Sequence, residues 1–323
     1  MRMSPVRRRK EEEKIVMGIL RALQSIRVPA LDSLFSAVTL LGEETFFTVI
    51  GLLIFWCVDK KWGIRILLAG LAGTVLNQLL KAIFIVPRPW VLDPTFTIVE
   101  RARAAATGYS FPSGHTQSAA TVFGMIALWR KRPWVWAACT GAVLLVGFSR
   151  MYLGVHTPWD VGVSLATGIV TVACVNALMN RCEGTARGRL IVGGVMLALV
   201  LTLLAVVLFV PVREGSIAEF DAHGVENAWK LLGTVVGLLL IWYMDVRGTH
   251  FPVQAVWWAQ VIKCVVGVAL VLAVRTGLKP LLNMLFPEKP FAHAIRYFAM
   301  AFVGGGLWPM TFGSFSRLGK QKG

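Results

Sequence analysis

The stretch FPSGHTQSAATVFGMIALW, residues 111–129, places a polar cluster directly before a long apolar run. Ser113 and Gly114 lie where a helix is expected to begin, and the run from Ala119 to Trp129 continues that helix. A titratable histidine, His115, falls in the first turn. Ionisable groups this close to an apolar helix mark a functional site by default.

The composition of the whole chain is that of a membrane protein. Of its 323 residues, 56% are hydrophobic and 15% are charged, whereas a soluble domain has roughly 45–50% apolar and about 25% charged residues. The mean hydropathy is +0.66. We therefore predict an all-α fold, a polytopic transmembrane helical bundle.

The apolar runs predict ten helices, the first of which is interrupted by Pro29 and Asp32. Their expected ranges are 14–40, 44–58, 63–85, 114–130, 133–150, 156–180, 189–210, 229–244, 253–276 and 291–313.

The net charge of +16 is distributed as an orientation signal and not as a nucleic-acid surface. Basic residues cluster in both terminal tails and in the short segments 59–65, 130–134 and 181–189. If these face the cytoplasm, both termini are cytoplasmic, and residues 1–14 form a tail and not a cleaved signal peptide. The extracytoplasmic segments are then 41–44, 86–113, 150–156, 211–228 and 277–290.

Three polar clusters interrupt the apolar pattern, and this topology brings all of them to the extracytoplasmic face. They are KAIFIVPRP (81–89), PSGH (112–115) and SRMYLGVHTPWD (149–160). Lys81 and Arg88 are two helical turns apart and could face one way, although two cations at a helix end could also merely reach toward water.

The other two clusters suit an anion and a nucleophile. Backbone N–H groups and the helix dipole favour an anion at Ser113 and Gly114, although serine is also a common N-cap. His156 and Asp160 share one helix face, where a carboxylate orients an imidazole ring, and Arg150 offers a planar fork for phosphate. A His–Asp pair that only joins two helices is the alternative.

Together the clusters resemble the three motifs of the type 2 phosphatidic acid phosphatase (PAP2) superfamily, which includes lipid phosphate phosphatases, glucose-6-phosphatase and vanadium haloperoxidases. The matching residues are Lys81-x6-Arg88-Pro89, Pro112-Ser113-Gly114-His115 and Ser149-Arg150-x5-His156-x3-Asp160. We expect a PAP2-like catalytic core of about six helices in residues 1–182. Residues 183–323 form an extension of about four further spans, to which the resemblance assigns no role.

The resemblance implies a role for each motif residue. His156 would be the nucleophile that forms a phosphohistidine, Asp160 would orient it, and His115 would be the general acid. The resemblance implies neither a metal nor a cofactor. The phosphoryl oxygens would be held by Lys81, Arg88, Ser113, Gly114 and Arg150.

The expected enzyme is an integral membrane phosphatase, in the plasma or inner membrane, acting on a lipid phosphate or diphosphate from the extracytoplasmic side. In a bacterial host a polyprenyl diphosphate such as undecaprenyl diphosphate is favoured, ahead of phosphatidate and phosphatidylglycerol phosphate. A soluble phosphate ester is the alternative substrate, and a lipid flippase or transporter is the alternative function. Arg101 and Arg103 could contact a second phosphate or be solvated. The C-terminal spans could support a homo-oligomer.

Overall fold

The computed structural model describes residues 5–210 and 214–317, and within these ranges all regular structure is helical, as predicted. Parts of the predicted terminal tails (1–4 and 318–323) and of the acidic loop (211–213) lie outside the described residues. The helices are α1 Pro5–Ser25, α2 Pro29–Val38, η1 Thr39–Gly42, α3 Glu44–Cys57, α4 Lys60–Phe84, α5 Pro89–Leu92, η2 Glu100–Ala102, α6 Gly114–Arg130, α7 Pro133–Tyr152, α8 Pro158–Cys182, α9 Ala186–Phe209, α10 Ala218–Met244, η3 Asp245–Thr249, α11 Trp257–Leu285, α12 Ala292–Ala301, η4 Phe302–Leu307, α13 Trp308–Met310 and α14 Phe312–Arg317.

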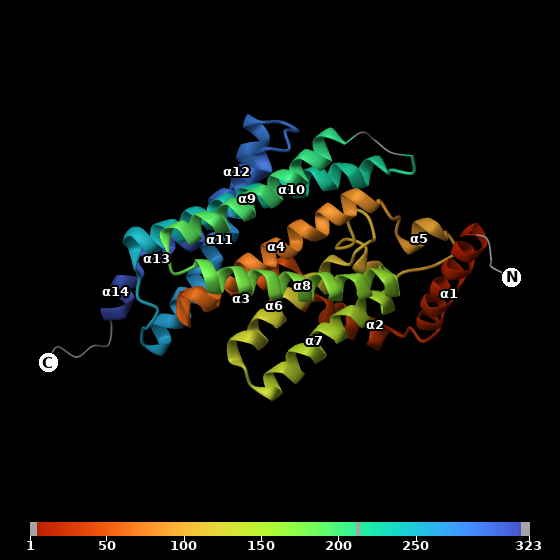
Figure 1. Cartoon of the computed structure of the whole chain (residues 1–323), viewed down its shortest axis with the longest axis horizontal. Helices are drawn as coiled ribbons and strands as arrows, with labels where there is room; N and C mark the ends of the chain where they lie inside the picture. The colour runs from red at the N-terminus through yellow and green to blue at the C-terminus, as the bar shows by residue number, and fades with distance from the viewer. Residues whose placement is uncertain (1–4, 211–213, 318–323) are drawn as a thin grey trace.

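The chain is an integral membrane protein with multiple spans, but fewer helices qualify as spans than the ten predicted. In the described residues, six helices are long and apolar enough to cross a membrane, or up to seven if the bent pair Pro29–Gly42 and Glu44–Cys57 forms one span. The helix α6 has only 17 residues. The last predicted helix is divided by the π-helical turn Phe302–Leu307. In Figure 1 the long helices α4, α8, α9 and α10 run along the long axis of the molecule.

The predicted helix 14–40 does not exist as one element. It breaks before Pro29, because the residue that precedes a proline favours an extended conformation, and Val28 is extended. The end of α1 packs on the loop after α5: Arg21 pairs with Asp93 at 2.6 Å, and Leu20 is fully buried.

The first and last described helices lie at different ends of the bundle. In Figure 1, α1 lies beside α5 at one end of the bundle, whereas α14 lies at the other end. The cytoplasmic placement of both termini stays a prediction.

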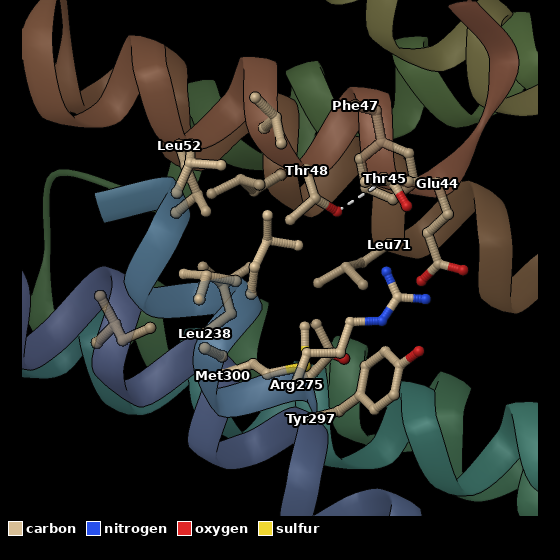
Figure 2. Close-up of a pocket in the computed structure, with 18 residues that line it drawn as sticks. Glu44, Thr45, Phe47, Thr48, Leu52, Leu71, Leu238, Arg275, Tyr297 and Met300 are labelled. Carbon is tan, nitrogen blue, oxygen red and sulfur yellow. Dashed lines mark hydrogen bonds between the residues drawn. The ribbon is translucent and has the colours of Figure 1, made fainter. Parts of the chain in front are cut away.

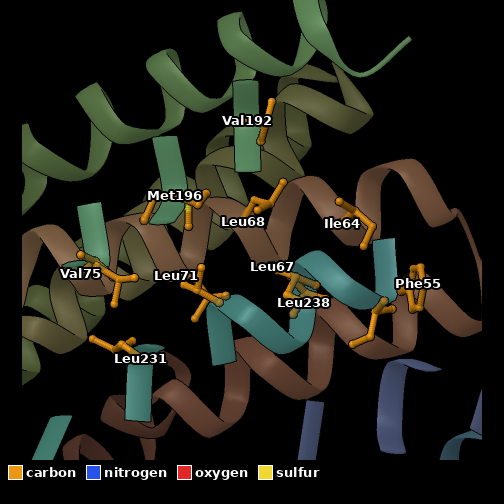
Figure 3. Close-up of a cluster of buried hydrophobic side chains, with 14 of the residues drawn as sticks. Phe55, Ile64, Leu67, Leu68, Leu71, Val75, Val192, Met196, Leu231 and Leu238 are labelled. Carbon is orange, nitrogen blue, oxygen red and sulfur yellow. The ribbon is translucent and has the colours of Figure 1, made fainter. Parts of the chain in front are cut away.

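The main hydrophobic core surrounds α4 and continues across the predicted domain boundary at residue 182. Figure 3 shows Leu68 and Leu71 of α4 between Met196 of α9 and Leu231 of α10. Aliphatic side chains from both halves of the chain thus share one buried cluster. The C-terminal extension is packed directly against the helix that carries the first motif.

Small residues let α10 and α12 approach closely. A Cβ atom at Gly233 would lie 2.1 Å from the Ala294 carbonyl oxygen, and one at Gly237 would lie 2.6 Å from the Ala301 Cβ. Glycines four residues apart on one helix face are a common means of close packing between membrane helices. This contact holds α12 beside the part of α10 that approaches the motifs.

Candidate active site

The three sequence motifs meet at one end of the bundle, where α4 and α7 end and α6 and α8 begin. The Nη1 atom of Arg88 lies 2.9 Å from Nε2 of His156, although the two residues are 68 positions apart. The Ser113 amide donates to the Asp160 carbonyl at 3.1 Å, which joins the starts of α6 and α8. The structure therefore brings the motif residues together as the predicted common face requires.

The hydrogen bonds around His156 define its tautomer. Arginine has no acceptor atom, so Arg88 must donate to Nε2 of His156, and the proton of the neutral ring then lies on Nδ1. That Nδ1 atom is 3.4 Å from Oδ2 of Asp160. The lone pair that can act as a nucleophile is consequently the one on Nε2, which accepts the hydrogen bond from Arg88.

Asp160 is held in place at the start of α8. Its Oδ2 atom accepts hydrogen bonds from Ser110 Oγ at 2.5 Å and from the Thr157 amide at 2.7 Å. The Thr157 side chain in turn accepts from the Asp160 amide, which completes a capping box. The local sequence TPWD therefore fixes both the helix start and the position of the carboxylate.

Burial lowers the pKa of His156 well below its ordinary value, and the positive charges of Arg88, Arg150 and Lys81 lower the pKa further. Only 2% of the residue is exposed. A histidine whose pKa is lowered in this way is neutral near pH 7, so its Nε2 lone pair is not lost to protonation.

The two cations of the first motif bind the loop that covers the site. Lys81 donates to the carbonyls of Tyr109 and Ser110, and Arg88 donates to the carbonyls of Thr107 and Gly108. Both cations are buried. The loop 107–110 is thus attached to the groups that are predicted to hold phosphoryl oxygens.

Arg150 and His115 have unused polar atoms in the described part of the chain. Arg150 is fully buried and donates from Nη1 to Thr39 Oγ1 at 2.9 Å, but its Nε and Nη2 atoms have no partner there. The Nε2 atom of His115 is likewise buried without a partner. Buried donors of this kind are costly unless they bind a group such as a phosphate.

A cavity lies at the centre of this arrangement. Of the predicted site residues, those that line it are Lys81, Arg88, Gly114, His115 and His156. The other predicted catalytic and phosphate-binding residues, Ser113, Arg150 and Asp160, are buried and do not line it.

The structure does not bring Arg101 and Arg103 to this cavity. Arg103 pairs with Glu100 at 2.7 Å, and Arg101 donates to Ser33 Oγ at 3.2 Å. Both arginines are exposed and already have polar partners. The expectation that they contact a second phosphate therefore has no support in the geometry.

Several residues of the site were not predicted from the sequence. Asn227 and Lys230 of α10 line the cavity. Ser110 donates a hydrogen bond to Asp160, and Thr39 accepts one from Arg150. Lys230 carried a recognisable signal, because a lysine at the start of an apolar run is a functional candidate. Ser110 and Thr39 carried none, since serine and threonine are common in loops.

These features define a polytopic helical membrane protein whose buried His–Asp pair is surrounded by cations. Residues 62–183 match the PAP2 superfamily, and residues 229–321 match the transmembrane extension of PAP2 superfamily phosphatases. The chain belongs to the PAP2 superfamily, as the motifs predicted.

Three known proteins with similar sequences are phosphatases by name. The chain is 37% identical to an undecaprenyl-diphosphatase of Bacillus subtilis over 32% of this chain and 50% of the relative. It is 30% identical to an undecaprenyl-diphosphatase of Sulfolobus acidocaldarius over 42% of this chain and 64% of the relative. Identity to phosphatidylglycerophosphatase B of Bacillus subtilis is 30%, over 47% of this chain and 77% of the relative.

The first two of these matches cover half and 64% of the relatives' own lengths. No solved structure matches the chain.

Proposed function

We propose that the protein is an integral membrane phosphatase that hydrolyses a lipid phosphate or diphosphate through a phosphohistidine at His156. The observation that carries this proposal is the orientation of His156. Its Nδ1 atom faces Asp160, and its Nε2 atom lies among the cations at a cavity lined by His115. Binding of a lipid headgroup alone, as in a flippase, would need the cations but not the paired side chains of His156 and Asp160.

In the proposed reaction, Nε2 of His156 attacks phosphorus and the bond to the leaving oxygen breaks. Before this attack, Arg88 exchanges its hydrogen bond to Nε2 for one to a phosphoryl oxygen, which frees the Nε2 lone pair. Asp160 then stabilises the positive imidazole that the attack produces. His115 donates a proton to the leaving oxygen and later accepts one from the water that cleaves the phosphohistidine. Lys81, Arg88 and Arg150 stabilise the charge of the transition state.

A polyprenyl diphosphate such as undecaprenyl diphosphate is the favoured substrate, followed by phosphatidylglycerol phosphate and phosphatidate. Two of the similar proteins are undecaprenyl-diphosphatases, and the third is a phosphatidylglycerophosphatase. We expect the purified protein to release phosphate from undecaprenyl diphosphate with a higher kcat/KM than from the two glycerolipids.

The measurement is phosphate release from a panel of these lipids and glucose 6-phosphate in detergent, without added metal. Release from glucose 6-phosphate alone would support the soluble-ester alternative instead. Binding of the lipids without any release would favour a transporter.

We further propose that the site is extracytoplasmic. The basic segments 59–65, 130–134 and 181–189 belong to the helix ends opposite the motif end, which suits a cytoplasmic position for them. A single cysteine at Ala104 should then react with an impermeant thiol reagent on intact cells, and one at Gly184 should not.

Both reporter positions are exposed, and a Cβ at Gly184 meets no atom within 4 Å. The five native cysteines are replaced first. Labelling at 184 but not at 104 would place the site in the cytoplasm.

A further inference from the structure

A second cavity lies between the catalytic core and the C-terminal extension. Figure 2 shows that side chains of α3 and α4 form one wall, and that side chains of α10, α11 and α12 form the others. Most of its lining is aliphatic, as Leu52, Leu71, Leu238 and Met300 illustrate. The cavity exists only because the extension packs against α3 and α4.

This apolar cavity adjoins the site cavity. Glu44 lines both of them. On α10, Lys230 and Leu231 line the site cavity, and Thr234 and Leu238, one and two turns further on, line the apolar one. One helix wall therefore runs along both cavities, and we call this pair of neighbouring cavities the groove.

Along α4, as along α10, one stretch of the helix lines the site cavity and the next stretch lines the apolar cavity. Lys81 and Asn77 line the site cavity, whereas Leu71 and Leu67 line the apolar one. Leu67 is fourteen residues from Lys81, which is about 21 Å along a helix. Half of a hydrocarbon core is roughly 15 Å thick. At Leu67, the lining of the apolar cavity on α4 therefore lies farther from Lys81 than half the thickness of a hydrocarbon core.

Polar groups occur at one end of the apolar cavity. Figure 2 shows Glu44, Arg275 and Tyr297 together there. The Glu44 carboxylate interacts electrostatically with both Arg275 and Lys230. Lys230 also pairs with Glu226 at 2.8 Å. The groove is thus cationic and polar near the site and aliphatic beyond it, which matches a phosphate group followed by a hydrocarbon chain.

We propose that the C-terminal extension completes the substrate site, with the apolar cavity taking the hydrocarbon chain of the lipid next to its phosphate and Lys230 lying at the junction. This inference rests on the proposed lipid phosphatase function. The position of the apolar cavity next to the site favours a chain attached to the reacting phosphate over an unrelated lipid or a second protein copy.

The test compares two valine substitutions on α11. Val268 lines the apolar cavity, and Val265, three residues earlier, is 63% exposed on the outside of the bundle. In Val268→Trp, we expect kcat/KM for undecaprenyl diphosphate, divided by kcat/KM for p-nitrophenyl phosphate, to fall at least tenfold. Val265→Trp should keep the wild-type ratio. Equal ratios in both variants and the wild type would overturn the proposal.

A second measurement does not depend on turnover or on the folding of a variant. The wild-type protein is photolysed with a lipid phosphonate that carries a diazirine on its chain, and the adducts are mapped by mass spectrometry. Adducts on Val268, Leu272 or Leu238 are expected, and adducts confined to the outer faces of α7 and α8 would overturn the proposal. Adducts at the cavity without release of phosphate from any lipid would refute the phosphatase function but keep the lipid groove.

Discussion

Replacement of His156 by alanine is expected to lower phosphate release by about 10⁴-fold or more, because the variant lacks the proposed nucleophile. The polar contacts of the side chain are with Arg88, Asp160 and Ser110. Arg88 and Asp160 keep other hydrogen bonds, so removal of the imidazole should leave the helical bundle intact. Activity is measured on the preferred lipid, and folding is checked by size-exclusion chromatography and thermal unfolding in detergent.

His250→Asn is the matched control for this substitution. His250 is exposed at the end of the bundle opposite the site, and its φ of 33° is one that asparagine tolerates. This variant should have wild-type activity. Near-wild-type phosphate release by His156→Ala, or phosphate trapped on the protein of that variant in an alkaline quench, would refute the covalent mechanism.

Substitution of His115 by alanine is expected to have an effect that depends on the leaving group. A general acid contributes roughly 10²–10⁴-fold when the departing oxygen is strongly basic. Lipid alkyl phosphates have such an oxygen, whereas the oxygen of p-nitrophenol leaves without a proton. We expect a loss in that range on the alkyl substrate and a much smaller loss on the aryl one.

The measurement is kcat/KM of wild type and variant on both substrates. His115→Gln serves as a second variant, since an amide keeps a hydrogen-bond donor near the position of Nε2 but cannot transfer its proton. If the fold loss is equal on alkyl and aryl phosphates, His115 is not the general acid and only helps to position the phosphate.

The sequence alone determined the class of fold and the family. Apolar runs and their basic flanks identify membrane helices, because the free energy of burying each segment in lipid depends on its own residues. The start of α6 at Gly114 and of α7 at Pro133 follows from local signals. The motif residues could also be named, since Lys81 through Asp160 stand at spacings that are visible without any tertiary contact.

Only the tertiary structure decided which residues outside the motifs complete the site. The predicted loop 211–228 is in large part the beginning of α10, which starts at Ala218, and this helix carries Lys230 to the cavity from the far half of the chain. The tertiary structure also directed Nε2 of His156 toward Arg88, placed α1 across the site end, and left Arg101 and Arg103 with other partners. Periodicity and motif spacing report on one segment at a time, whereas these features depend on contacts between segments that are distant in the chain and pack together only in the folded bundle.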